Sequence, residues 1–130
     1  MSYLYTDMTI SQLRQQLRKV GQQIERQLDT LMEHKPLLRG SVYRLRRRCG
    51  KAGCRCTRGE LHESWVFLSR EKGVQRLRVV PQGQTARWRE WAEDYRRFRR
   101  AQRELGRLYR EALRLAGELE ALRARPPPAA

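Results

Sequence analysis

Two runs of apolar residues, spaced three and four positions apart, set the main constraint on how this chain can fold. The first run consists of Ile10, Leu13, Leu17, Val20, Ile24, Leu28 and Leu31. The second run consists of Trp88, Trp91, Tyr95, Phe98, Leu105, Leu108, Ala112, Leu115, Leu119 and Leu122. This spacing places each run on one face of an α-helix, as in the seam of a coiled coil. The sequence therefore predicts two long helices.

Local signals predict where these helices begin and end. Thr9 and Gln12 have the spacing of a capping box at the start of the first helix. Pro36 cannot continue a helix, so the first helix should end near Glu33 or His34. The second should run from Thr85, a candidate N-cap, to about Arg123. The chain then divides into four segments: an N-terminal helix in residues 1–39, a basic β head in 40–83, a C-terminal helix in 84–125 and a disordered tail in 126–130.

The two helices are expected to pair antiparallel, because the segment between them is short and both apolar seams need cover. At about 1.5 Å per residue, the first spans roughly 36 Å and the second roughly 55–60 Å. This mismatch leaves two alternatives open. Either the second helix breaks near Gly106 or Gly117, or its far end pairs with another copy to give a homodimer.

Residues 40–80 lose the helical periodicity and contain all three cysteines. Alternating apolar residues predict three strands, at Ser41–Arg47, Ser64–Ser69 and Gln75–Val80. Arg70–Gly73 is a plausible hairpin turn between the last two strands, and Pro81 ends the sheet. The predicted fold is thus mainly α with a small β head. Two long helices form an antiparallel coiled coil around a short three-stranded sheet and a zinc knuckle.

The zinc knuckle is predicted from four residues with Cys-x4-Cys-x-Cys-x5-His spacing: Cys49, Cys54, Cys56 and His62. Zinc prefers four thiolate and imidazole ligands in a tetrahedron, and Gly50 and Gly53 allow the tight backbone that this spacing needs. Four protein ligands leave no open position for water, so the Zn²⁺ ion would be structural. Cysteines unrelated to metal and a redox switch are the alternatives. An odd number of cysteines disfavours a closed disulfide set.

The cysteine stretch also carries a resemblance. It reads Arg-Cys49-Gly-Lys-Ala-Gly-Cys54-Arg-Cys56, followed by Gly59-Glu-Leu-His62. Over roughly Gly40–Pro81 this resembles a family of small bacterial proteins of no established activity. Their motif continues with Gly-Pro-Tyr after the histidine, where this chain has Glu-Ser-Trp. Genes of that family often lie near transposases, so the resemblance implies an association with mobile DNA and a transposase or other mobile-element protein as a partner.

Charge points to a polyanionic ligand. The net charge is +15, and residues 40–80 alone hold eleven basic and three acidic residues. Arginine, which makes up most of the basic residues, binds phosphate through two parallel hydrogen bonds. Strand alternation should bring several arginines together on one face, opposite the apolar side chains. The expected contact residues are Arg44, Arg46, Arg48, Lys51, Arg55, Arg58, Arg76 and Arg78.

The predicted function is a nucleic-acid-binding accessory protein that contacts the phosphate backbone, with DNA favoured over RNA. Trp65 or Phe67 would either stack on a base or pack inside the head. The alternative is a coiled-coil oligomerisation module in which the metal head is only a cap. An enzyme is not expected, because the sequence has no paired carboxylates near a histidine, no phosphate loop and no nucleophile–base set. The N-terminus has no signal-peptide pattern and no segment approaches a membrane span, so a cytoplasmic location without membrane contact is expected.

Overall fold

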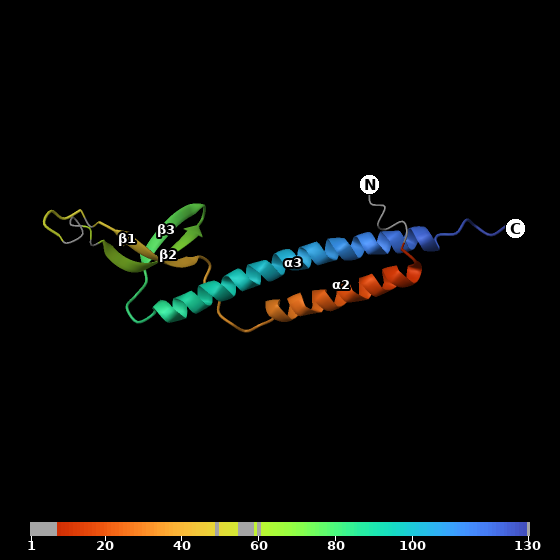
Figure 1. Ribbon diagram of the computed structural model, residues 1–130, viewed down its shortest axis with the longest axis horizontal. Coiled ribbons are helices and arrows are strands. Elements are labelled where there is room, and N and C mark those ends of the chain that lie inside the picture. The colour runs from red at the N-terminus through yellow and green to blue at the C-terminus, as the bar shows by residue number, and fades with distance from the viewer. Residues whose placement is uncertain (1–7, 49, 55–58, 60, 130) are drawn as a thin grey trace. The chain divides into compact units, whose positions relative to one another are not determined.

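The computed structural model describes residues 8–48, 50–54, 59 and 61–129. Its elements follow in the order α2, β1, β2, β3 and α3 (Figure 1). The chain divides into two compact units. The helical unit comprises Met1–Glu33 with Phe98–Ala130, and the sheet unit comprises His34–Arg97. Helix α3 (Thr85–Arg123) contributes its first part to the sheet unit and its remainder to the helical unit.

Helix α2 (Ile10–Leu31) begins with the predicted capping box. The Thr9 hydroxyl oxygen accepts a hydrogen bond from the backbone N–H of Gln12 at 3.1 Å, and the Gln12 side chain accepts one from the N–H of Thr9 at 2.9 Å. Two of the backbone donors that every helix start leaves unpaired are thereby satisfied. The helix ends a few residues before Pro36, slightly earlier than expected.

The core of the helical unit lies between α2 and the later part of α3, which run antiparallel (Figure 1). Four residues from the predicted seams are buried there: Leu13, Val20, Leu108 and Leu115. Partly buried side chains surround them, namely Met8, Leu17, Ile24, Ala112 and Leu119. The prediction that the two apolar seams cover each other is confirmed, because these buried residues come from both runs.

Helix α3 is continuous from Thr85 to Arg123, so the break expected near Gly106 or Gly117 is wrong. A glycine inside a helix costs only about 1 kcal/mol relative to alanine, which packing against a second helix readily offsets. The length mismatch has a different explanation. The part of α3 up to Arg97 belongs to the sheet unit. This part of the helix therefore does not need α2 to bury its apolar side chains.

The sheet is antiparallel and has the strand order β1-β2-β3, with β1 at Ser41–Arg47, β2 at His62–Glu71 and β3 at Val74–Val79. The bounds of β1 are as predicted, and β2 extends two residues further at each end. Lys72 and Gly73 connect β2 to β3 and have φ angles of +50° and +79°. Positive φ at both central residues defines a type I′ turn, whose twist matches that of a hairpin. The predicted hairpin is confirmed.

The core of the sheet unit forms where α3 packs on the sheet. The rings of Phe67 and Trp88 meet edge to face, with centroids 5.7 Å apart. The buried apolar residues of this unit are Val66, Phe67, Val80 and Ala92. Gly40 precedes β1, and a Cβ atom on it would lie 2.5 Å from both the carbonyl oxygen of Leu68 and the Phe67 ring. Only glycine therefore lets the chain approach β2 this closely.

Candidate nucleic-acid interface

Four of the expected contact arginines lie on one face of the sheet, which we call the arginine face: Arg44, Arg46, Arg76 and Arg78. Their cross-strand partners on β2 are, in the same order, Trp65, Glu63, Ser69 and Phe67. Cross-strand partners share a face, and the four β2 residues are separated by even steps, so all eight side chains lie on the same side. The predicted convergence of arginines from β1 and β3 is confirmed.

Buried residues lie on both faces of the sheet, because Val66, which is 1% exposed, is on the face opposite the arginines. Phe67 and Ser69, both buried, belong to the arginine face, and the first turns of α3 pack against its middle. The opposite face, which we call the apolar face, consists of Tyr43, Leu45, Val66, Leu68, Leu77 and Val79 together with polar residues at its ends. Leu77 and Val79 are 46% and 61% exposed there. The long arginine side chains of the outer strands remain more than half exposed, so buried residues and charged groups share this face.

Glu63, the second residue of β2, partly neutralises the arginines of β1. The Nε atom of Arg46 lies 2.8 Å from a carboxylate oxygen of Glu63, and an Nη atom of Arg44 lies 3.8 Å from the other. Both arginine side chains remain more than half exposed. Ion pairs at such exposure contribute about 0–1 kcal/mol, so a phosphate group can compete with the carboxylate for these guanidinium groups.

Glu71, at the other end of β2, partly neutralises the arginines of β3 in the same way. Its carboxylate lies 3.4 Å from the Nε atom of Arg76 and 3.1 Å from an Nη atom of Arg78. The two glutamates therefore hold the four arginines over the sheet without cancelling their charge. The arginine face keeps an excess of positive charge at both edges.

Trp65 lies at the centre of a cluster that reaches from the sheet to α3. The guanidinium carbon of Arg44 is 5.1 Å from the centroid of the Trp65 ring, and that of Arg89, on α3, is 4.8 Å from it. Cations over an aromatic ring are attracted to its electron-rich face. Trp65 thus binds arginines in the free protein, while Phe67 packs against Trp88. The sequence left open whether these aromatic residues stack on a base or pack inside the head, and Phe67 packs inside the head.

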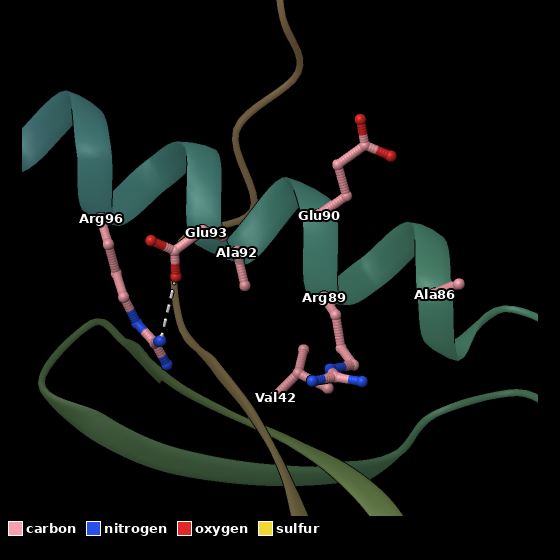
Figure 2. Close-up of a pocket in the computed structure, with 7 residues that line it drawn as sticks. All are labelled: Val42, Ala86, Arg89, Glu90, Ala92, Glu93 and Arg96. Carbon is pink, nitrogen blue, oxygen red and sulfur yellow. Dashed lines mark hydrogen bonds and ion pairs between the residues drawn. The ribbon is translucent and has the colours of Figure 1, made fainter.

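A groove of about 410 Å³ lies between β1 and α3, and it is lined by Val42, Ala86, Arg89, Glu90, Ala92, Glu93 and Arg96. Figure 2 shows Arg89 and Arg96 on the side of α3 that faces Val42, with Glu90 pointing away. Arg96 pairs with Glu93 at 3.3 Å. Since Arg89 belongs both to this groove and to the Trp65 cluster, the basic surface continues from the strands onto α3.

Sequence reasoning missed Arg89. Its role depends on α3 packing over β2, which no local pattern reports. The signal that could have found it is the seven-residue step from Arg89 to Arg96, because two helical turns place both on the same face as the buried Ala92. Of the other expected contacts, Arg48 and Lys51 are exposed beyond the end of β1, and Arg55 and Arg58 lie outside the described residues.

Two of the four expected zinc ligands are described, and the structure brings them together. The Sγ atom of Cys54 lies 3.0 Å from the Nε2 atom of His62. The backbone N–H of Cys54 donates to the carbonyl oxygen of Lys51 at 3.3 Å, and Gly53 makes this turn possible with a φ of +83°. His62 is the first residue of β2.

The donor atoms of this pair suit zinc. With bonds of about 2.3 Å to sulfur and 2.0–2.1 Å to nitrogen, a tetrahedral ion would hold its sulfur and nitrogen ligands roughly 3.6 Å apart. The observed separation is about that of a direct hydrogen bond, and a small opening would admit the ion. The other two expected ligands, Cys49 and Cys56, lie outside the described residues, and the described ones alone include no cluster of three metal-binding side chains.

Comparison with known protein families assigns this chain to a family. A family model described as a domain of unknown function, DUF6788, matches residues 10–90. The chain belongs to this family. The DUF6788 match contains all of α2, the whole sheet and the first turn of α3, so it includes the arginine face and the Cys54–His62 pair. No curated protein and no solved structure matches the chain.

Charge is unevenly divided between the two units of this DUF6788 protein. The sheet unit holds 17 basic and 6 acidic residues, a net charge of +11, while the helical unit holds 12 and 8, a net charge of +4. On α3, hydrogen bonds from Arg107 lower the pKa of Glu104, and hydrogen bonds from Arg114 lower the pKa of Glu111. These pairs offset charge within the helical unit. Most of the net positive charge therefore belongs to the unit that carries the arginine face.

None of the described helices is apolar over a stretch long enough to cross a bilayer.

Proposed function

We propose that this protein binds nucleic acid through the phosphate backbone and that the arginine face is its contact surface. One observation carries the proposal: the register of the sheet aligns Arg44, Arg46, Arg76 and Arg78 on a single face. Arg89 extends that face onto α3. Glu63 and Glu71 neutralise these four guanidinium groups only in part, and a phosphate backbone supplies further anions at regular intervals.

The ion pairs on the face suit such an exchange. Glu63 and Glu71 hold the arginines in place while the protein is free, and each pair is exposed enough for phosphate oxygens to replace the carboxylate. Contacts of this type position a protein on nucleic acid without reading its sequence. The resemblance of the cysteine stretch to proteins encoded near transposases favours DNA and a mobile-element protein as the partner.

A structural zinc ion held by Cys49, Cys54, Cys56 and His62 belongs to the same proposal. When bound, it would cross-link the segment between β1 and β2 and supply no reactive water, because all four positions would be filled by protein. The 3.0 Å approach of Cys54 to His62 supports this assignment. The ion would tie that segment to the end of the sheet where Arg46 lies.

Fluorescence anisotropy with a labelled 30-base-pair duplex tests the proposal. We expect log Kd to rise linearly with log salt between about 50 and 200 mM, and we expect Arg76→Ala combined with Arg78→Ala to reduce that slope by about 2. The matched control combines Arg14→Ala with Arg18→Ala, two exposed arginines on α2 that remove the same charge. Equal losses in both double variants would show that net charge alone, and not the arginine face, attracts the duplex.

A second candidate function rests on the helical unit. Tyr109 and Leu113 are 51% and 72% exposed, and they lie one turn apart on α3. Exposed apolar residues at this spacing favour an oligomerisation surface, the alternative that the sequence left open. Light scattering separates the two candidates, because self-association through these residues would persist in high salt and be lost in a Leu113→Ser variant.

A further inference from the structure

The outer edge of β3 has no partner strand. β3 comes last in the strand order β1-β2-β3, and all six of its residues are exposed. No backbone hydrogen bond joins its far side to another segment in the described part of the chain. An open edge of this kind presents a row of backbone N–H and C=O groups to any chain in an extended conformation. A further strand can therefore add to the sheet at β3.

The register of the sheet shows which backbone groups this edge presents. Continuing the β2–β3 register places Val80 opposite Trp65, and the N–H of Val80 donates to the carbonyl oxygen of Trp65 at 2.9 Å. Hydrogen-bonded and non-hydrogen-bonded pairs alternate along an antiparallel ladder. Every second residue of β3 therefore directs its N–H and C=O groups away from β2, namely Gln75, Leu77 and Val79.

The side chains along this edge combine positive charge with apolar surface. Arg76 and Arg78 lie on the arginine face, are more than half exposed and share the single carboxylate of Glu71. Leu77 and Val79 lie on the apolar face and are also exposed. A strand that adds to β3 meets cations on one of its sides and apolar side chains on the other.

We propose that β3 binds an extended segment of a partner protein in which acidic and apolar residues alternate. The acidic residues lie opposite Arg76 and Arg78, and the apolar ones lie opposite Leu77 and Val79. In antiparallel addition the two arginines take non-hydrogen-bonded positions, where the Cα atoms of opposing residues are only about 4.5 Å apart. Opposite charges that face each other at such positions stabilise a sheet. Backbone hydrogen bonds supply affinity, and the alternating side chains supply specificity.

A second copy of β3 does not fit this edge. In an antiparallel pair related by a twofold axis, the arginine faces of both copies lie on the same side of the joined sheet. At the registers of greatest overlap, Arg76 then lies opposite either Arg76 or Arg78 of the second copy. Like charges that face each other across strands are destabilising. The arginines that accept an acidic segment therefore oppose edge-to-edge association of the protein with itself.

A synthetic peptide of sequence Thr-Val-Glu-Val-Glu-Thr tests the proposal with the ¹⁵N-labelled full chain. At saturation we expect amide hydrogen exchange to slow at Leu77 and Val79 and to stay unchanged at Arg76 and Arg78, whose N–H groups already bond to β2. The isomeric peptide Thr-Val-Val-Glu-Glu-Thr has the same charge without the alternation and should give no such protection. Equal protection by both peptides, or by neither, would overturn the proposal.

Two substitutions at one position separate the backbone contribution from that of the side chain. Leu77→Pro removes the outward N–H and should abolish binding of the alternating peptide, whereas Leu77→Ala keeps it and should weaken binding only in part. Proline is tolerated on an edge strand where its nitrogen faces solvent. Protected amides at Arg76 and Arg78 show that the β2–β3 ladder persists in each variant. Equal affinities in the two variants would contradict strand addition at this edge.

The charge contribution is tested at the arginines themselves, which does not require the proline variant to fold. Arg76→Ala and Arg78→Ala should each weaken binding of the alternating peptide about two- to fivefold, the usual range for a cross-strand charge pair. Arg14→Ala removes the same charge from an exposed position on α2 and should leave the affinity unchanged. Equal losses in all three variants would show that net charge alone attracts the peptide.

This partner surface is independent of the proposed function, although both use Arg76 and Arg78. Peptide binding with the expected protection, in a protein that does not bind the duplex, would refute the proposed function and leave the partner surface intact. Duplex binding that depends on Arg76 and Arg78, with no protection of Leu77 and Val79 by the peptide, would have the opposite meaning.

Discussion

The Sγ atom of Cys54 and the Nε2 atom of His62 lie 3.0 Å apart, although eight positions separate the two residues in the chain. Their approach joins the segment that follows β1 to the first residue of β2. This thiol and imidazole would supply two of the four ligands of the proposed tetrahedral zinc site. The proposed zinc ion can therefore be tested at these two side chains.

We expect the purified wild-type protein to contain about one zinc ion per chain, and Cys54→Ser and His62→Ala each to lose most of it. Elemental analysis measures the metal, and thermal unfolding with and without a chelator measures its contribution to stability. His34→Ala is the matched control, because it removes the other histidine, which is exposed. A wild-type protein that stays free of zinc after refolding with the metal would refute the site.

Gly40→Ala should lower the free energy of unfolding by about 1–3 kcal/mol, the usual cost of forcing extra atoms into a packed site. Its added methyl group would meet the Leu68 carbonyl oxygen and the Phe67 ring at 2.5 Å. Denaturant unfolding measures the change. Gly21→Ala, inside α2 where nothing lies within 4 Å, should instead raise stability by about 0.5–1 kcal/mol. The two substitutions are chemically identical, so opposite signs would isolate the contact at Gly40.

Two leucines on the same helix should respond very differently to truncation. Leu108→Ala should cost about 2–5 kcal/mol, because Leu108 is 1% exposed in the core of the helical unit. Leu113→Ala should change stability by less than about 0.5 kcal/mol, since Leu113 is 72% exposed. Chemical denaturation measures both. A large cost at Leu113 would mean that a second copy buries this residue in solution.

Glu63→Gln should tighten binding of duplex DNA by about three- to tenfold at low salt. The substitution removes the carboxylate that pairs with Arg44 and Arg46, which leaves both guanidinium groups available to phosphate. Glu104→Gln changes the net charge by the same amount but frees only Arg107 in the helical unit, so it should have a smaller effect. Anisotropy at several salt concentrations compares them. Equal tightening in both variants would argue against the arginine face as the contact surface.

The stability of the helical unit should fall in acid. Hydrogen bonds from Arg107 and Arg114 lower the folded-state pKa of Glu104 and Glu111 below the value in the unfolded chain. Their contribution is therefore present above the unfolded-state pKa and is lost as the pH falls through the folded-state pKa. Thermal unfolding between about pH 6 and pH 3 measures this loss. A variant with both glutamates changed to glutamine should show a weaker dependence, because its stability no longer depends on those two ionisations.

The elements of this protein were predictable where the signal is local. Capping at Thr9, the bounds of β1 and the turn at Lys72–Gly73 depend on residues that are neighbours in the chain, and the sequence placed all three. The division of α3 between two units was not predictable. Its apolar seam is continuous, and a seam shows which face is buried without showing what covers it.

In the candidate site, too, the features set by local sequence were predictable and those set by tertiary packing were not. Strand alternation was enough to put Arg44 and Arg76 on one face, because that face depends only on period and pairing. Alternation did not reveal that α3 covers this face, so the stacking of Arg89 on Trp65 was missed.

The distribution of acidic side chains between the two faces of the sheet affects how neighbouring molecules of this protein can associate. Both glutamates that pair with arginines lie on the arginine face, and none of the described strand residues on the apolar face is acidic. With a net charge of +11 on each sheet unit, like-charge repulsion opposes contact between the exposed Leu77 and Val79 of neighbouring molecules. A polyanion that neutralises the arginines removes this barrier. If the proposed function holds, molecules bound next to each other on one strand are then expected to associate, and binding to the strand is expected to be cooperative.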